Sequence, residues 1–383
     1  MGLPRIQVIK MRSNYVIGLN SGTSFDGIDV ALVKFKKNDL RPIFVDGIVC
    51  EYPKKIKEQI RELIASAGSI HNLSPQKISK LDISLGNLFA NTALQIIKKR
   101  GLKKEDILLI GSHGQTIYHK PRVKSVQIGN GKIIAKRTDI KTINDFREAD
   151  IKAGGEGAPL MPFLDQVCFG KTKKGIITLN IGGIANITAT GKNIKPIAFD
   201  TGPGNALIDL VTRKYFNTDF DRDGLIAKKG NVIFKYIKKA ALDPYFRISP
   251  PKSTGKEYFN QQFIDRYFSQ IKKKRDLIST LTFFTAYTIK YSLEKYVFRK
   301  HKISEIVISG GGLKNKTLVS FLKKILPRIN ITSSDKYGLP SKYKEAILFA
   351  LLGYTCLKQI PNNIPSCTGA RKKTVTGKIC VGI

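Results

Sequence analysis

Tryptophan is absent from the chain, and methionine and histidine are scarce, with three and four residues among 383. Long apolar runs are absent too. A transmembrane helix needs about 20 consecutive apolar residues, so we expect no membrane-spanning segment. Residues 1–14 carry Arg5, Lys10 and Arg12 but lack the apolar stretch of a secretory signal. These absences argue against a membrane or secreted protein, and we expect a cytoplasmic one.

Cysteine is also sparse, and its positions show no pattern. The five cysteines are odd in number and lack the spacing of a metal site, which favours free thiols in a reducing compartment. They are Cys50, Cys168, Cys356, Cys367 and Cys380. None of them is a compelling nucleophile.

Acidic residues are few relative to basic ones. Lys and Arg number 66 against 29 Asp and Glu, which gives a formal charge of +37. Such a charge is compatible with a nucleic-acid or anionic-membrane partner. However, the lysines are spread along the whole chain and form no recognisable nucleic-acid motif. Ile, Asn, Phe and Tyr are also frequent, as in the products of AT-rich genomes. We therefore favour compositional drift and expect no specific nucleic-acid partner.

The hydrophobic content of 42% over 383 residues is enough for a large core that divides into two lobes. The most informative segment is 16–33, in which two apolar, strand-like runs flank a polar turn. Glycines and hydroxyls in such a turn can approach and hydrogen-bond an anion, and carboxylates can hold a divalent cation. The candidate nucleotide-binding residues are Gly22, Thr23, Ser24, Phe25, Asp26, Gly27, Ile28 and Asp29, with Asp26 and Asp29 as metal ligands. The alternative is an ordinary polar hairpin loop.

Segment 175–188 repeats the pattern of strand, glycine-rich tip and strand, which suggests a duplicated fold with a nucleotide between its lobes. The candidate ligand-binding residues of this second tip are Asn180, Gly182, Gly183 and Asn186. A third apolar run ends in Gly310, Gly311 and Gly312, where a flat base or ribose can lie against the backbone. Alone this glycine run is weak, but after two hairpins it is more specific.

Segment 197–209 has a carboxylate, Asp200, at the end of a strand-like run, before a Gly/Pro turn and a helix-like region. A carboxylate at this position suits acid–base chemistry, and the alternative is a helix cap. Helix-like regions are also expected near 54–67 and 75–100, the latter because its apolar residues recur at helical spacing. Segment 107–116 reads as a buried strand that runs into a polar turn. Lys252, Ser253 and Thr254 form a turn that either contacts substrate or phosphate or packs the lobes.

The order of these motifs resembles the superfamily of sugar kinases, heat-shock ATPases and actin, and within it the anhydro-N-acetylmuramic acid kinase family. The resemblance runs nearly end to end. It is carried by residues 18–27, 111–116, 145–150, 153–160, 179–186, 199–205, 221–224, 250–255, 345–346 and 365–370.

The resemblance implies a two-lobed α/β fold, actin-like and built from a duplicated ribonuclease H-like unit, with a cleft between the lobes. The first lobe is expected over 14–145, completed by 358–383, and the second over 146–357. The implied enzyme opens 1,6-anhydro-N-acetylmuramic acid with water and phosphorylates O6 from ATP. The product, N-acetylmuramic acid 6-phosphate, enters cell-wall recycling. The family also leads us to expect a homodimer.

In that chemistry Asp200 is the candidate base that takes a proton from the attacking water. The first hairpin holds the ATP phosphates and Mg²⁺, the second lines their opposite side, and Gly310–Gly312 flank adenosine. The candidate sugar-binding residues are Ser112, His113, Gln115, Arg147, Asp150 and Glu345. Arg147 is our choice for the lactyl carboxylate, because a guanidinium matches a carboxylate with two parallel hydrogen bonds. His113 is alternatively a structural hydrogen-bonding group, and Glu345 alternatively a helix-dipole partner.

The chain departs from the family pattern at a few positions. Asn20 stands where the family usually has Met, and Glu156 replaces a usual Gln, which puts the sugar affinity in doubt. Two other functions stay open at this point. One is a kinase of an ordinary sugar, in which Asp200 deprotonates a hydroxyl. The other is a basic polyanion-binding or scaffold protein that has kept a kinase fold.

Overall fold

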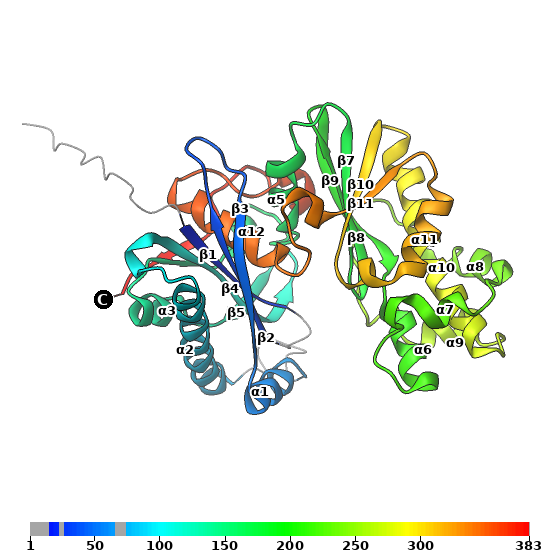
Figure 1. Ribbon diagram of the computed structural model, residues 1–383, viewed down its shortest axis with the longest axis horizontal. Helices are drawn as coiled ribbons and strands as arrows, with labels where there is room; N and C mark the ends of the chain where they lie inside the picture. Colours follow the sequence, from blue (N-terminus) through cyan, green and yellow to red (C-terminus); the bar gives the residue numbers. More distant parts are fainter. Residues whose placement is uncertain (1–14, 23–26, 66–73, 383) are drawn as a thin grey trace, which may run out of the picture. The chain divides into compact units, whose positions relative to one another are not determined.

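The computed structural model describes residues 15–22, 27–65 and 74–382 of the chain (Figure 1). Two compact units are present, one formed by the chain up to Leu160 together with Tyr343 onward, the other by Met161–Lys342. These boundaries differ from those expected at 145/146 and 357/358. The reason is helix α12 (Lys344–Leu357), which packs on strands of the first unit and therefore belongs to it.

The first unit contains a seven-stranded sheet. In spatial order its strands are β12 (Lys378–Cys380), β6 (Thr142–Asn144), β4 (Ile107–Lys120), β1 (Tyr15–Ser21), β2 (Gly27–Lys34) and β3 (Ile43–Glu51). The seventh strand, β5 (Lys124–Ile128), pairs with the C-terminal half of β4. Strands β1, β2 and β3 are antiparallel neighbours, whereas β4 is parallel to β1 and β6 is parallel to β4. The predicted strand–turn–strand at 16–33 is thus the β1–β2 hairpin.

Helices cover both faces of this sheet. Helices α1 (Lys54–Ala65) and α2 (Pro75–Lys99) bury Ile60 and Phe89 against Leu19 and Ile28 on one face. The Ser74 hydroxyl caps α2 by accepting from the Lys77 amide, as expected for a helix that begins with proline. Helix α2 was predicted from its periodicity and α1 as a helix-like region, and both begin at the expected residues. Shorter helices complete the unit: α3 (Gly131–Thr138), α4 (Glu148–Lys152) and α13 (Pro365–Thr368).

The opposite face carries α12, which is apolar almost all round and almost completely buried. Two glycines allow it to approach the strands closely. A Cβ atom at Gly18 would lie 1.8 Å from the Ala346 carbonyl oxygen, and one at Gly111 would lie 2.1 Å from the Phe349 carbonyl oxygen. A side chain at either position would push the helix off the sheet. The same face therefore brings Glu345, at the start of α12, to the ends of β1 and β4.

The second unit contains a five-stranded sheet. In spatial order its strands are β11 (Asn330–Ser333), β10 (Ile303–Ser309), β7 (Gly175–Ile181), β8 (Ile184–Gly191) and β9 (Ile194–Pro203). Its helices are α5 (Met161–Phe169), α6 (Ala206–Phe216), α7 (Leu225–Lys228), α8 (Phe234–Ala240), α9 (Gln261–Phe268), α10 (Lys274–Leu293) and α11 (Lys316–Ile325). Helices α10 and α11 pack on one face of the sheet through Ile289, Leu318 and Leu322, and α5 lies on the other face.

The two sheets repeat one topology. In both, three antiparallel strands in hairpin order are followed by two parallel ones, so that β3-β2-β1-β4-β6 corresponds to β9-β8-β7-β10-β11. This is the strand order of a ribonuclease H-like unit, present twice. The predicted fold class, a duplicated two-lobed α/β fold of the actin-like kind, is therefore confirmed. Within the described residues, no helix combines the length and apolarity that crossing a membrane requires.

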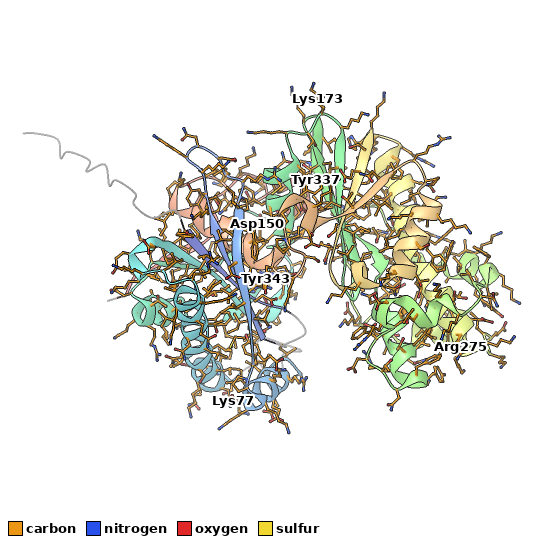
Figure 2. The ribbon with its side chains drawn as sticks, viewed as in Figure 1. Lys77, Asp150, Lys173, Arg275, Tyr337 and Tyr343 are labelled. Carbon is orange, nitrogen blue, oxygen red and sulfur yellow. The ribbon has the colours of Figure 1, made fainter. Side chains whose placement is uncertain are left out.

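Basic side chains project from both units rather than from one arm. Lys77 lies on α2, Lys173 precedes β7 and Arg275 lies in the first turn of α10, and all three are exposed (Figure 2).

Candidate active site

The first candidate phosphate-binding element is the β1–β2 hairpin. Residues 23–26 lie outside the described residues, so the predictions for Thr23, Ser24, Phe25 and Asp26 stay predictions. Ile28 is completely buried in the core under α2, so its side chain is not available to a ligand. Asp29 pairs with Asn20 across the hairpin and therefore points to the α12 face. Gly27 leaves no room for a side chain, because its Cβ would lie 2.2 Å from the Cys50 carbonyl oxygen.

Asn20, which was not among the candidate site residues, forms part of this face. It is buried, and its side-chain amide donates to Oε2 of Glu345 at 2.6 Å. The two residues are 325 positions apart in the chain, so no local pattern signals the contact. The chain's departure from the family at this position was the available signal. The contact holds the Glu345 carboxylate beside the end of β1.

His113 and Arg147 lie together on the same face. The Nε2 atom of His113 accepts from the guanidinium of Arg147, at 3.3 Å from Nε and 3.1 Å from Nη2. The His113 ring stacks on Phe349 of α12 at a centroid distance of 4.4 Å. Burial, and secondly the positive charge of Arg147, lower the pKa of His113 well below its usual value, so the imidazole is neutral. A neutral acceptor is what the neighbouring guanidinium requires.

Arg147 itself is held in place by the protein. Its Nη1 donates to the Gly157 carbonyl oxygen at 3.2 Å. Burial lowers the pKa of Arg147 to about 10, opposed by the charge of Glu345, so the side chain is positive at neutral pH. A fixed, partly desolvated guanidinium of this kind is suited to bind a carboxylate.

Ser112 and Gln115 do not join this group. Because side chains alternate along a strand, Ser112 lies on the face of Ile110, which belongs to the core under α2. Its buried hydroxyl has no hydrogen-bond partner within the described part of the chain. Gln115 accepts from the Ser21 hydroxyl at 2.5 Å and lies where the β1–β4 register shifts. The two residues are thus on the other side of the sheet from His113.

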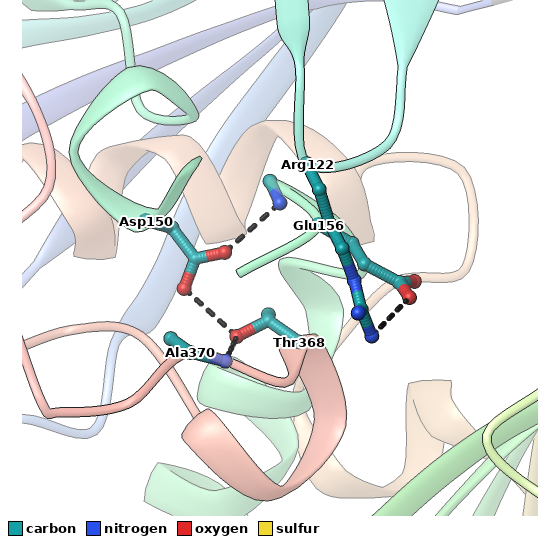
Figure 3. Close-up of polar contacts among 6 residues, drawn as sticks. Arg122, Asp150, Glu156, Thr368 and Ala370 are labelled. Carbon is teal, nitrogen blue, oxygen red and sulfur yellow. Dashed lines mark hydrogen bonds and ion pairs between the residues drawn. The ribbon is translucent and has the colours of Figure 1, made fainter. Parts of the chain in front are cut away.

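Asp150 is completely buried and engaged by the protein itself (Figure 3). Its Oδ2 accepts from the Gly157 amide at 2.9 Å, and its Oδ1 accepts from Asn363 Nδ2 and from the Thr368 hydroxyl, each at 2.8 Å. These bonds connect α4, the loop 153–157 and the C-terminal segment. They assign Asp150 a structural role, and its predicted contact with the sugar stays a prediction. Nearby, Glu156 faces Arg122 at 3.4 Å (Figure 3).

In the second unit, four polar residues lie side by side across the sheet, and we call them the polar row. Ser309 pairs with Asn180, Asn180 with Asn186, and Asn186 with Asp200. Their neighbours along the strands, such as Leu179 and Ile308, point to the opposite face and pack under α10 and α11. Alternation therefore places all four polar residues on the other face. Three were predicted as site residues and Ser309 was not.

The tip between β7 and β8 is tied to the start of α6. The Gly182 carbonyl accepts from the Asn205 amide at 2.8 Å, and the Gly183 carbonyl accepts from the Gly204 and Ala206 amides at 2.8 and 3.0 Å. Lys256, which sequence reasoning missed, lies over this tip. A Cβ at Gly183 would come within 2.5 Å of Cε of Lys256. The second hairpin therefore has a cation beside it.

The glycine run after β10 serves two purposes. Gly310 has φ of +85°, and a Cβ there would lie 2.6 Å from Oδ1 of Asn180, so this position requires glycine. A Cβ at Gly312 would lie 2.3 Å from Cγ2 of Ile181. Both glycines let the following short helix (Gly311–Lys314) pack on β7. Gly311 is different, since its nearest neighbour would be Nδ2 of Asn205 at 3.9 Å, which leaves space for a ligand.

Asp200 lies in surroundings that raise the pKa of its carboxylate. Its Oδ2 accepts from the Thr254 amide at 2.8 Å, and its carbonyl oxygen accepts from the Tyr245 hydroxyl at 2.7 Å. Burial raises the pKa of Asp200 to about 6, while the Thr254 amide and the charge of Lys252 oppose this and Glu257 adds to it. A base with a pKa near 6 is ionised at neutral pH and still accepts a proton readily. Asp200 does not cap α6, because Asn205 occupies that position.

A cage of protein ligands for a metal ion is not found among the described residues, in which no three His, Cys, Asp or Glu side chains are suitably grouped. Mg²⁺ does not require such a cage. It is commonly bound by one or two carboxylates together with phosphate oxygens and water. Asp29 is a described carboxylate that fits this donor set.

Comparison with known proteins identifies the family. A profile described as "Anhydro-N-acetylmuramic acid kinase" matches residues 14–382. The chain belongs to the anhydro-N-acetylmuramic acid kinase family. It is 40% identical to the anhydro-N-acetylmuramic acid kinase of Caldanaerobacter subterraneus, with 98% of each chain covered. Identity is 38% with the Clostridioides difficile enzyme and 37% with one from Bacillus cereus, each covering 95% of this chain and 98% of the relative. The predicted resemblance is thus confirmed, and the chain is a kinase of this family.

Proposed function

We propose that this kinase uses water to open 1,6-anhydro-N-acetylmuramic acid and transfers the γ-phosphoryl group of ATP to O6. The products are N-acetylmuramic acid 6-phosphate and ADP. Family membership supports the substrate class. The observation that carries the proposal is the Asp200 carboxylate on the polar row, whose surroundings suit a general base at neutral pH.

The reaction assigns one proton transfer to Asp200. The carboxylate removes a proton from water as the water oxygen bonds to C1, and the C1–O6 bond breaks with its electron pair left on O6. O6 attacks the γ-phosphorus, and the bond from that phosphorus to the bridging oxygen of ADP breaks. The departing charge passes directly to phosphate, so the protein mainly positions groups and neutralises charge. The proton on Asp200 returns to solvent before the next turnover.

The nucleotide is assigned to the two hairpins and the glycine run. Gly22, Gly27 and Ile28 are the described residues of the first hairpin that we assign to the phosphates, with Thr23–Asp26 as predicted above. Asn180, Asn186, Gly182 and Gly183 are assigned to the phosphates from the second unit. The cation of Lys256 beside Gly183 supports this assignment. Gly310–Gly312 are assigned to adenosine, and the open space at Gly311 is the supporting feature.

Asp29 and Asp26 are the proposed ligands of Mg²⁺, directly or through water. The ion would neutralise phosphate charge during transfer. Asp29 points to the same face as Asn20 and Glu345, and its carboxylate oxygens are the hard ligands that Mg²⁺ prefers.

The sugar is assigned to the α12 face of the first unit. Arg147 is proposed to bind the lactyl carboxylate, and His113 and Glu345 the hydroxyl and acetamido groups. The fixed guanidinium and its neutral imidazole neighbour support this assignment. Ser112, Gln115 and Asp150 were also predicted to bind sugar. Their positions favour supporting roles in the sheet and in the loop 153–157.

The product class implies a place in cell-wall recycling in the cytoplasm, and the family resemblance implies a homodimer. Sedimentation equilibrium of the purified protein tests the dimer: a single species at the monomer mass would remove it.

One assay tests the reaction itself. The enzyme is incubated with ATP, Mg²⁺ and the anhydro sugar in ¹⁸O-water, and the product is analysed rapidly by mass spectrometry. The proposal expects one ¹⁸O at C1 of the phosphorylated product, and the Asp200→Asn variant should lower kcat at least about 100-fold. Phosphorylation of an ordinary sugar without label would instead support a conventional sugar kinase. Analysis within seconds limits exchange at the anomeric carbon.

A further inference from the structure

We propose that Lys252 is a positioning residue for Asp200: its backbone holds the aspartate on β9, and its caged ammonium keeps the aspartate carboxylate ionised. The inference deepens the proposed function and rests on it, because Asp200 is the base of that reaction.

The backbone around Lys252 holds Asp200 at two points. The Asp200 amide donates to the Lys252 carbonyl oxygen at 3.1 Å. Two residues further on, the Thr254 amide donates to Oδ2 of Asp200 at 2.8 Å. The segment thus fixes both the main chain and the carboxylate of the aspartate. This geometry gives the turn at 252–254 a specific task, which the sequence left open between ligand contact and packing.

The lysine side chain is enclosed by aromatic rings. Its Nζ lies 4.4 Å from the ring centre of Tyr245, 5.6 Å from that of Tyr296 and 6.0 Å from that of Phe246, and the residue is 8% exposed. The same atom donates to the Tyr245 carbonyl oxygen at 3.4 Å. Cation–π contacts stabilise an ammonium that has lost its water. The Tyr245 hydroxyl in turn donates to the Asp200 carbonyl oxygen at 2.7 Å, so the cage and the aspartate are joined.

No carboxylate lies within ion-pair distance of Lys252 in the described part of the chain. The charge is therefore not cancelled locally and acts on Asp200 through space. The other charged or titratable groups that face this pair are Lys295 beside the lysine, Glu257 beside the aspartate, and the hydroxyls of Tyr245 and Tyr296. The positive charge of Lys295 disfavours the protonated form of Lys252, and the negative charge of Glu257 disfavours the ionised form of Asp200.

The two groups carry opposite charges at neutral pH. Burial and then Lys295 lower the pKa of Lys252 to about 8, opposed by Asp200. Burial raises the pKa of Asp200 to about 6, and Lys252 opposes that rise. Between these values the lysine is protonated and the aspartate ionised. Loss of the lysine charge by mutation makes ionised Asp200 less favourable near neutral pH.

The test is the titration of Asp200 itself, which requires no substrate. The protein is labelled with [¹³Cγ]aspartate, the Asp200 resonance is assigned by its loss in Asp200→Asn, and its pKa is measured by NMR. We expect Lys252→Met to raise the Asp200 pKa by about one pH unit. The acid limb of kcat/KM should move by the same amount. Lys235→Met is the matched control, because Lys235 also lies over a tyrosine ring, at 4.9 Å from the centre of Tyr236, but is exposed.

An Asp200 pKa that is equal in folded Lys252→Met and in wild type would overturn the proposal, since a merely structural lysine changes stability and not the titration. If Lys252→Met does not fold, Lys252→Gln decides, because its amide removes the charge and can still donate to the Tyr245 carbonyl oxygen. The Asp200 pKa should rise in this variant too, and a value equal to that of wild type would refute the role of the lysine charge. If the titration shifts but wild type fails to phosphorylate the anhydro sugar, the charge coupling stands and the proposed function fails.

Discussion

The guanidinium of Arg147 lies 3.1 and 3.3 Å from one nitrogen of His113, with the imidazole neutral and stacked on Phe349. The ring that accepts from the arginine is itself held by α12, so the orientation of the fork depends on the packing of that helix. His113 and the Gly157 carbonyl oxygen together fix the orientation of the arginine side chain.

Replacing Arg147 by Lys should therefore weaken sugar binding while leaving the fold intact. A lysine keeps the charge but cannot offer two parallel donors to a carboxylate. We expect KM for the anhydro sugar to rise about tenfold or more, with a smaller change in kcat and none in KM for ATP. Steady-state kinetics with each substrate varied measure this. Arg122→Lys, at an exposed arginine of the same unit, is the control, and equal effects of the two variants would contradict the assignment.

Asn20→Ala should release the Glu345 carboxylate without opening a large cavity. The lost bond of 2.6 Å is charge-assisted but only part-buried, because Glu345 itself is exposed, so we expect a loss of about 1 kcal/mol in transition-state binding of the sugar, read from kcat/KM. Asn20→Asp, which places two carboxylates together, should be worse still. If Glu345→Gln lowers kcat/KM but Asn20→Ala does not, the amide does not orient the carboxylate.

Asp150→Asn should destabilise the first unit rather than abolish catalysis selectively. Both carboxylate oxygens of Asp150 accept hydrogen bonds, from Gly157, Asn363 and Thr368. An asparagine has only one accepting oxygen, so its NH₂ group would meet at least one of these donors and leave that donor unsatisfied. Burying such a mismatch costs about 3 kcal/mol. Thermal unfolding by calorimetry measures the change, with exposed Asp139→Asn as the control. A variant of unchanged stability with a raised sugar KM would return Asp150 to the substrate site.

Asp200→Asn should stabilise the folded protein at alkaline pH while it lowers turnover. The folded state binds the Asp200 proton more tightly than the unfolded chain, because burial raises the pKa to about 6. Ionisation therefore removes stability as the pH rises through about 6. At pH 8 the variant should gain about 2 kcal/mol, and at pH 5 it should gain less. Urea unfolding at both pH values tests this, and a gain that is equal at the two would show that the carboxylate is not responsible.

Much of the architecture was predictable from the chain. The strand–turn–strand patterns at 16–33 and 175–188 and the helices at 54–67 and 75–100 all appear near their expected places, because apolar periodicity and turn chemistry are local properties. The placement of α12 was missed. Its sequence reads as a buried helix, but only Gly18 and Gly111, distant in the chain, show which sheet it packs against.

The positions of the candidate site residues were also predictable only in part from the sequence. Asn180, Asn186 and Asp200 lie on one row because antiparallel pairing and alternation put them there, so strand-end motifs were enough to find them. Ser112 and His113 are adjacent in sequence, yet alternation places them on opposite faces of β4. The motif at 111–116 contains both residues, and the sequence alone does not show which side chain faces a ligand.

The sequence by itself determined the family, the duplicated fold and the identity of the candidate base, since these follow from the order of motifs and from periodic burial. Only the tertiary structure decided which polar groups are bound by other groups of the protein. Asn20 meets Glu345, Asp150 meets Asn363 and Thr368, and Lys252 enters its aromatic cage only when distant segments pack together. Burial and partner choice set the charge and the pKa of each group, and neither is a property of a local segment.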